Sequence, residues 1–170
     1  MRLIVNPTSR SGRSRARLDF WLAELSRERQ PYALSLTRGP GDAAALAREA
    51  SETVVVAVGG DGTINEVLDG VLQSASPKTM GVLYAGTSPD FCRFNRIPFD
   101  DSAAALRTLL GGQARRVDAV KVVCADGPPA HFACGCNIGM GARVAAFANR
   151  YRRTLGDAAE IGRASCRGRV

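Results

Sequence analysis

Apolar runs alternate with amphipathic stretches over the first hundred residues. Four short runs rich in branched apolar side chains predict strands at Arg2–Val5, Tyr32–Leu36, Thr53–Val58 and Met80–Tyr84. Apolar residues at helical spacing predict helices at Ser14–Arg29, at Asp42–Ala50, from Ile64 onward and at Asp101–Leu110. Strands that alternate with helices are typical of an α/β fold with a parallel sheet covered on both faces. Asp42 is expected to be the N-cap of its helix.

The pattern changes near Val117. Two strand-like runs, 118–125 and 130–137, are joined by Asp126-Gly127-Pro128-Pro129, which is a hairpin signal. We therefore expect one domain at 1–116 and the start of a β-rich second domain at 117–160. That second domain is incomplete, because two strands and a helix do not close a β domain. Residues 161–170 have no hydrophobic period and resemble translated sequencing-adapter read-through, so we expect a non-native tail there.

The most informative segment runs from Val54 to Gly70 and reads VVVAVGGDGTINEVLDG. It predicts a strand, a glycine turn and a helix. Glycines on both sides of Asp61 let backbone N–H groups approach a ligand, and the following helix N-terminus favours an anion. Asp61 and Thr63 add a carboxylate and a hydroxyl, which suit a metal-bound phosphate. The alternative is a tight strand-to-helix turn with a polar cap.

Composition limits the classes of function. The net charge is +7, yet residues 1–141 hold 16 basic and 14 acidic residues, so the excess lies in the C-terminal arginines and does not indicate nucleic-acid binding. The five cysteines form no Cys-x-x-Cys pair, which argues against a disulfide framework. His131, Cys134 and Cys136 lack a suitably spaced fourth zinc ligand, so the cysteines are expected to be small apolar fillers. No apolar run approaches the ~20 residues of a membrane span and no signal peptide is visible, so a cytoplasmic protein is expected.

Four strand-end loops together carry a resemblance to a known family. The loop GGDGTINEV, the motif Asn6-Pro7-Thr8-Ser9, Thr37 followed by Gly41-Asp42-Ala43, and Gly86-Thr87-Ser88-Pro89-Asp90-Phe91-Cys92-Arg93 resemble motifs of the diacylglycerol kinase catalytic family. That family includes bacterial lipid kinases, sphingosine kinases and ceramide kinases. NAD kinases and phosphofructokinases share a related GGDG loop, but the first and last motifs favour the lipid branch.

The resemblance implies a three-layer, Rossmann-like nucleotide-binding domain followed by the start of a β-sandwich. It also implies a residue set. Asp61 is the candidate base or acceptor-orienting residue, and Asp90 and Asp118 are candidate magnesium ligands. The implied ATP-binding residues are Asn6, Pro7, Thr8, Ser9, Thr37, Gly59, Gly60, Asp61, Gly62, Thr63, Ile64, Asn65, Gly86 and Thr87. A competing assignment in the family places the base late in the second domain.

The implied function is a bacterial-type lipid kinase of phospholipid metabolism. With ATP and Mg²⁺ it would transfer the γ-phosphoryl group to the hydroxyl of diacylglycerol or a related lipid. Peripheral contact with the inner face of the membrane and a homodimer are both left open, and this fragment is expected to be inactive alone. Pro89 stands where the family has Asn, which removes a backbone donor and a side-chain amide. The alternatives are an NAD kinase-like enzyme and a non-catalytic nucleotide-binding module.

Overall fold

The computed structural model describes residues 1–9, 15–125, 127–135 and 139–144. The chain divides into two units, Met1–Cys134 and Gly135–Val170. The first unit holds every strand and helix discussed below. The predicted non-native tail at 161–170 and Cys136 lie outside the described residues.

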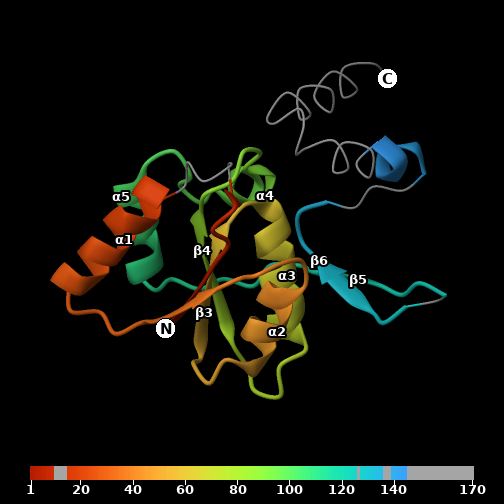
Figure 1. Cartoon of the computed structure of the whole chain (residues 1–170), viewed down its shortest axis with the longest axis horizontal. Coiled ribbons are helices and arrows are strands. Elements are labelled where there is room, and N and C mark those ends of the chain that lie inside the picture. The colour runs from red at the N-terminus through yellow and green to blue at the C-terminus, as the bar shows by residue number, and fades with distance from the viewer. Residues whose placement is uncertain (10–14, 126, 136–138, 145–170) are drawn as a thin grey trace. The chain divides into compact units, whose positions relative to one another are not determined.

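Strands and helices alternate over residues 2–95, and two strands end the first unit after a further helix, as Figure 1 shows. The elements in chain order are β1 (Arg2–Val5), α1 (Arg15–Arg27), β2 (Ala33–Leu36), α2 (Asp42–Glu49), β3 (Val54–Gly59), α3 (Asp61–Leu72), β4 (Thr79–Tyr84), α4 (Asp90–Asn95), α5 (Ser102–Leu110), β5 (Val120–Val122) and β6 (Ala130–Phe132). None of the helices in the described ranges combines the length and the apolar character that a membrane crossing requires.

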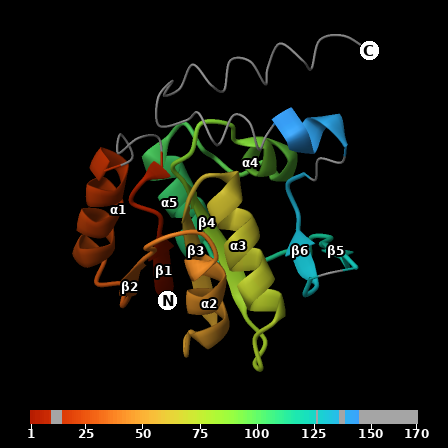
Figure 2. The same ribbon diagram turned by 45° about the vertical axis from the view of Figure 1, so that its right-hand side comes forward.

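The first four strands form one parallel sheet in the order β2-β1-β3-β4. Helices α2 and α3 cover one face and α1 and α5 cover the other, which gives three layers (Figure 2). This confirms the predicted α/β class with a parallel sheet. In such sheets ligands bind beyond the carboxyl ends of the strands, so the loops at that edge are the place to look for a site.

Side chains of successive strand residues point to opposite faces and form two separate cores. Ile4, Val55 and Ala57 face α2 and α3, where they meet Ile64 and Val67. The alternate residues on the other face are Leu3, Val5, Val56, Val58 and Leu83, which pack with Trp21 and Leu25 of α1. All of these side chains are buried. Because both faces are covered, the strands read as nearly continuous apolar runs, which is why the sequence predicted them well.

Three local expectations were wrong. The sequence predicts a loop over residues 86–93, but α4 begins at Asp90. Helix α3 begins at Asp61 rather than after Thr63, so most of the glycine turn belongs to the first helical turn. Asp42 is not the N-cap of α2, because Gly41 takes that position with φ at +85°. The Asp42 carboxylate instead accepts the N–H of Arg38 at 2.7 Å.

The hairpin β5–β6 was predicted, but its paired strands have only three residues each. It packs along α3 through one stripe of that helix. Asp69 Oδ1 accepts the main-chain N–H of His131 at 2.9 Å and lies 2.8 Å from His131 Nδ1. Asn65 Oδ1 accepts the N–H of Ala133 at 3.2 Å. The helix side chains thereby take the place of a neighbouring strand, since alternate N–H groups on one edge of the strand meet acceptors spaced one helical turn apart.

Gly70 sets how closely α2 and α3 approach. A Cβ at Gly70 would lie 2.1 Å from the carbonyl oxygen of Ala44 and 2.8 Å from Ala47 Cβ. We expect Gly70→Ala to lose about 1–3 kcal/mol of unfolding free energy in urea, despite a helix-propensity gain of about 1 kcal/mol. Gly62→Ala is the matched control, because it lies in the same helix and its Cβ would meet no atom within 4 Å. Equal stability of Gly70→Ala and the parent would contradict this account.

Asp69 holds the hairpin through acceptor oxygens rather than through charge alone. Asp69→Leu removes the acceptor of the His131 N–H, so amide exchange over residues 130–135 should quicken about tenfold, the value of one hydrogen bond. Asp69→Asn keeps an acceptor oxygen and should exchange nearly like the parent. Hydrogen exchange with mass spectrometry distinguishes the two variants. An Asn variant that exchanged as fast as the Leu variant would assign the effect to the charge of Asp69.

Candidate active site

The four strand-end loops meet at one edge because ladder hydrogen bonds continue beyond the strands. The N–H of Asn6 binds Val58 O at 3.0 Å, and the N–H of Thr37 binds Val5 O at 2.9 Å. The N–H of Ala85 binds Gly59 O at 2.8 Å. The loops that follow β1, β2, β3 and β4 therefore begin side by side at the carboxyl edge of the sheet.

Gly60 and Gly86 allow the loops after β3 and β4 to touch, and Gly59 packs against Thr63 of its own segment. A Cβ at Gly86 would lie 2.4 Å from Gly60 Cα, so only a residue without a side chain fits there. A Cβ at Gly59 would lie 2.5 Å from Thr63 Oγ1. Gly62 differs, since a Cβ there would meet no atom within 4 Å. Gly59, Gly60 and Gly86 allow close packing, whereas Gly62 leaves open space at the start of α3.

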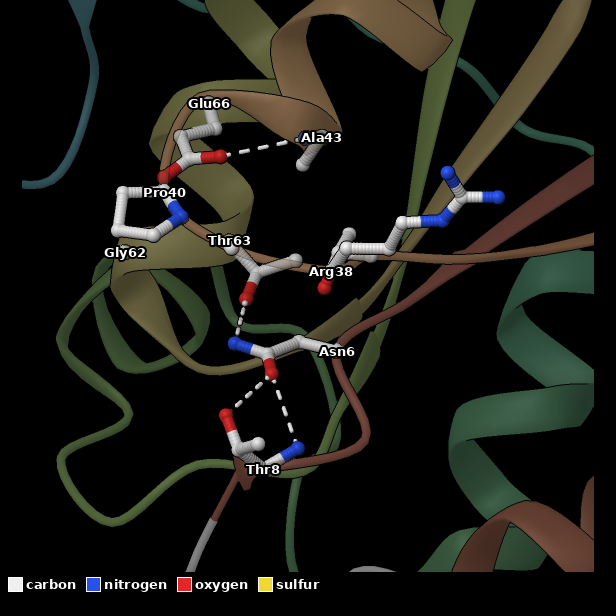
Figure 3. Close-up of a pocket in the computed structure, with 10 residues that line it drawn as sticks. Asn6, Thr8, Arg38, Pro40, Ala43, Gly62, Thr63 and Glu66 are labelled. Atoms are coloured by element: carbon white, nitrogen blue, oxygen red, sulfur yellow. Dashed lines mark hydrogen bonds between the residues drawn. The ribbon is translucent and has the colours of Figure 1, made fainter.

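That open space belongs to a pocket of about 210 Å³, shown in Figure 3. Its walls come from the loops after β1 and β2 and from the N-terminal halves of α2 and α3. The lining residues are Asn6, Thr8, Thr37, Arg38, Gly39, Pro40, Ala43, Gly62, Thr63 and Glu66. Five of them, Asn6, Thr8, Thr37, Gly62 and Thr63, were predicted from the sequence as nucleotide-binding residues.

Asn6 fixes the polar floor of the pocket. Its amide Nδ2 donates to Thr63 Oγ1 at 3.2 Å, while its Oδ1 accepts from Thr8 N at 3.0 Å and from Thr8 Oγ1 at 2.8 Å (Figure 3). The Asn-Pro-Thr turn is thus tied to the first turn of α3. The Arg38 guanidinium points away from Asn6 and Thr63 in this view. The predicted residues Pro7 and Ser9 lie in the same turn, Pro7 exposed and Ser9 buried.

Glu66 is a pocket residue that the sequence prediction missed. It caps α2 from α3, because Glu66 Oε2 accepts the N–H of Gly41 at 3.0 Å and of Ala43 at 3.3 Å. A carboxylate at a helix N-terminus is stabilised by the helix dipole. The cap expected from Asp42 is therefore supplied by Glu66, 24 positions later in the chain. The only sequence signal for Glu66 was its place in the motif GGDGTINEV, directly after Asn65.

Asp61 lies at the start of α3 and reaches the start of α4. Its Oδ2 accepts the N–H of Asp90 at 3.1 Å. Its Oδ1 is buried and has no hydrogen-bond partner among the described residues. Burial raises the pKa of Asp61, an effect only partly opposed by N–H groups of Asp90 and Phe91. A carboxylate held this way is poised to take up a proton, which is the pattern of many functional sites.

The surroundings of Asp61 are largely apolar. Burial raises the pKa of the thiols of Cys92 and Cys134, each to about 12, and the nearby Asp61 charge raises them further. Burial also raises the pKa of the Tyr84 hydroxyl. These groups stay neutral near pH 7. Cys92 and Cys134 therefore serve as small packing residues, as expected.

Comparisons with known proteins agree with this geometry. Residues 1–122 match the family model of the diacylglycerol kinase catalytic domain. The chain belongs to this family. The predicted membership and the nucleotide-domain fold are thereby confirmed.

Curated members of the diacylglycerol kinase family resemble the chain over the same region. The diacylglycerol kinase of Bacillus subtilis (strain 168) is 36% identical over 120 residues, covering 69% of this chain and 40% of that protein. The diacylglycerol kinase of Staphylococcus aureus (strain MRSA252) is 34% identical over 124 residues, covering 71% and 39%. This chain therefore spans about 40% of the length of these relatives.

A solved structure shares the fold. The crystal structure of a diacylglycerol kinase from Bacillus anthracis str. Sterne superposes with a TM-score of 0.57 at 26% sequence identity. The match covers 65% of this chain and 42% of that one.

The remaining predicted site residues occupy three kinds of position. Ile64 is fully buried and its N–H donates to Gly60 O, while Asn65 binds the hairpin, so neither directs a free polar group into the pocket. Thr87 is exposed beside Gly86. Asp90 begins α4 next to Asp61. Asp118 is exposed and lines a second pocket together with Phe91.

The described parts of the chain contain no group of three or more His, Cys, Asp or Glu side chains arranged to hold a metal ion. Asp61 and Asp90 are nevertheless adjacent, and the Asp90 charge raises the pKa of Asp61. Because Mg²⁺ usually uses one or two protein carboxylates together with water and substrate phosphates, a single carboxylate such as that of Asp90 fits such an ion.

The raised pKa of Asp61 makes a prediction for stability against pH. Below the pKa that Asp61 has in the unfolded chain, its carboxyl is protonated in both the folded and the unfolded state. As pH rises through the folded pKa, the buried charge forms and stability is lost. Asp61→Asn keeps an acceptor for the Asp90 N–H but carries no charge. We expect it to match the parent near pH 4 and to be more stable at pH 7, measured by urea unfolding at both values. A constant difference between the proteins across this range would contradict the assignment.

Proposed function

We propose that the chain is the nucleotide-binding part of an ATP-dependent lipid kinase, with Asp61 as the base or acceptor-orienting residue. The observation that carries the proposal is the half-buried Asp61 carboxylate at the glycine-lined start of α3, one oxygen of which has no hydrogen-bond partner among the described residues. The intact protein would transfer the γ-phosphoryl group of ATP to the hydroxyl of diacylglycerol or a related lipid. The product would be a phosphatidic acid-like lipid.

The nucleotide phosphates are expected at the start of α3. Gly60 occupies the N-cap position and no side chain caps the helix in the described ranges, so the N–H groups of the first turn face the pocket mouth. Such a helix N-terminus attracts anions through its N–H groups and its dipole. The hydroxyls of Thr37 and Thr63 add donors around the same space.

Asp61 has the position and the protonation behaviour that the transfer requires. Phosphoryl transfer to an alcohol depends on positioning and charge stabilisation, and it benefits from a carboxylate that accepts the hydroxyl proton. Burial makes Asp61 a stronger base than an exposed carboxylate, because its charged form is less well solvated. Mg²⁺, when bound, would neutralise phosphate charge, and Asp90 and Asp118 are the residues proposed to hold it.

Pro89 does not prevent formation of the loop that precedes Asp90. It is the N-cap of α4 at φ −82°, within the range that proline allows, and its carbonyl accepts the N–H of Arg93 at 2.9 Å. The Asp90 N–H is shared between Ser88 O at 2.9 Å and Asp61 Oδ2 at 3.1 Å, so the loop with Pro89 still brings Asp90 to Asp61. The loop geometry is thus compatible with catalysis, and this favours the kinase over a non-catalytic module.

Gly62 provides the test of nucleotide binding. A methyl group at Gly62 would project into the open part of the pocket without touching protein atoms. We expect Gly62→Ala to fold normally and to bind ATP at least tenfold more weakly in calorimetry. Gly127→Ala is the matched control, because its Cβ also meets no atom within 4 Å but Gly127 lies in the hairpin turn. ATP affinity equal in all three proteins would remove the pocket from the proposal.

The transfer step is tested with the product of the complete gene. With Mg²⁺ and ATP it should phosphorylate diacylglycerol in mixed micelles, with NAD as the competing acceptor. Asp61→Asn should reduce the rate by at least a hundredfold while ATP affinity stays near that of the parent, because the side chain acts on the acceptor. Activity that persists in the variant would move the base to another residue.

A further inference from the structure

A second pocket of about 360 Å³ lies between α4 and the segment that leads into β5. Its apolar wall is formed by Phe91, Phe94 and Val117. Two arginines, Arg115 and Arg116, and one carboxylate, Asp118, line the same pocket. None of these six residues lines the nucleotide pocket. A hollow lined by two phenylalanines and two arginines differs in character from the nucleotide pocket, whose lining includes the hydroxyls of Thr8, Thr37 and Thr63.

Phe94 is the most exposed of the large apolar residues in the described ranges. It is 87% exposed, whereas Phe91, one helical turn earlier on α4, is 3% exposed. Val117 beside it is 40% exposed. An aromatic ring exposed to water at the edge of this pocket lacks the hydrophobic stabilisation that burial would give it. The feature therefore points to a partner that covers it.

The charges around Phe94 define the partner's chemistry. Arg116, which lines the pocket, and Arg96, at the end of α4, are exposed and form no ion pair with any described residue. Arg115 is used within the protein, where its guanidinium donates to the main-chain oxygen of Asn95 and to Asn95 Oδ1, the latter at 2.9 Å. With Asp118 as the single acidic residue of the lining, the surface is net positive and complements an anionic one.

We propose that Phe94, Arg116 and Val117 form a membrane-docking patch that binds anionic bilayers, with the Phe94 ring inserted at the headgroup level. Aromatic rings flanked by arginine favour that interface, since the ring enters the acyl boundary while the cations meet lipid phosphates. The inference rests on the proposed lipid kinase function, because it names the surface through which the site reaches its lipid.

The position of the patch relative to Asp61 supports a lipid surface. Asp90, whose N–H binds Asp61, opens α4, and Phe94 lies four residues later. At 1.5 Å per residue, the two lie only about 6 Å apart along the helix axis. A bilayer that held Phe94 would therefore lie near the carboxylate that must meet a lipid hydroxyl. A soluble acceptor would not need an exposed aromatic ring at that place.

The test measures partition of the purified chain onto vesicles. Vesicles of phosphatidylglycerol and phosphatidylcholine are compared with vesicles of phosphatidylcholine alone at 0.15 M salt. The arginines of residues 142–170 give the chain a background affinity for anionic lipid, so the comparison between variants decides. We expect Phe94→Ser to weaken partition about tenfold and Arg116→Gln about fivefold. Phe20→Ser is the matched control, because Phe20 is 38% exposed on α1 and should leave partition unchanged.

Insertion is read separately with Phe94→Trp. Its indole emission should shift to the blue on anionic vesicles, while Trp21, which is 1% exposed in the core, stays constant. Equal partition of Phe94→Ser and the parent would overturn the proposal, as would the absence of a blue shift. Loss of a dimer in Phe94→Ser without loss of vesicle binding would assign the surface to a second copy. ATP affinity should not change in Phe94→Ser, so failure here is distinguishable from failure of the nucleotide site.

Discussion

The close approach of two backbones, at Gly60 and Gly86, is the constraint on which the site depends. A Cβ on Gly86 would lie 2.4 Å from Gly60 Cα, and 2.6 Å from the Tyr84 hydroxyl. Because neither loop carries a side chain at the contact, the starts of α3 and α4 converge beyond adjacent strands β3 and β4. That convergence brings the Asp61 carboxylate to the Asp90 N–H. The glycine motif therefore meets a packing requirement between two loops, at Gly60, and the proposed phosphate site uses a different glycine, Gly62.

Most of the fold could be predicted from the sequence because its strands are buried on both faces. Runs such as Val54–Gly59 are apolar throughout, so their boundaries were placed within a residue or two. Helix α4 escaped prediction because six residues are too few to show a helical period. Its burial also depends on contacts from other elements, with Phe91 and Cys92 entering the core between α2, α3 and β4. The N-cap of α2 failed for a similar reason, since the capping carboxylate comes from Glu66 on another helix.

In the candidate site, too, residues with local partners could be predicted from the sequence, and contacts with distant segments could not. Loop residues whose partners are local, such as Asn6 and Thr8, were found from motif and turn chemistry, and the structure brings them together with Thr63. Asn65 was assigned to the nucleotide because it lies in the motif. In the structure its side-chain oxygen accepts the N–H of Ala133, 68 residues later, a contact that no local pattern reveals. Sequence motifs thus identify which helix carries the site, while the direction in which each side chain points is set by the elements packed against that helix.

Asp61 joins these observations into one physical argument. Its carboxylate begins α3, accepts the first N–H of α4 and keeps one oxygen buried with no hydrogen-bond partner in the part of the chain that the structure describes. For stability alone an asparagine would serve as well, because it offers the same acceptor without a buried charge. The charge is costly in the folded state, as the raised pKa records, and an uncompensated cost of this kind is typical of functional positions. In the proposed transfer, the same burial that weakens the fold would make Asp61 the better base. The cost of this buried charge is therefore the physical reason for proposing Asp61 as the base.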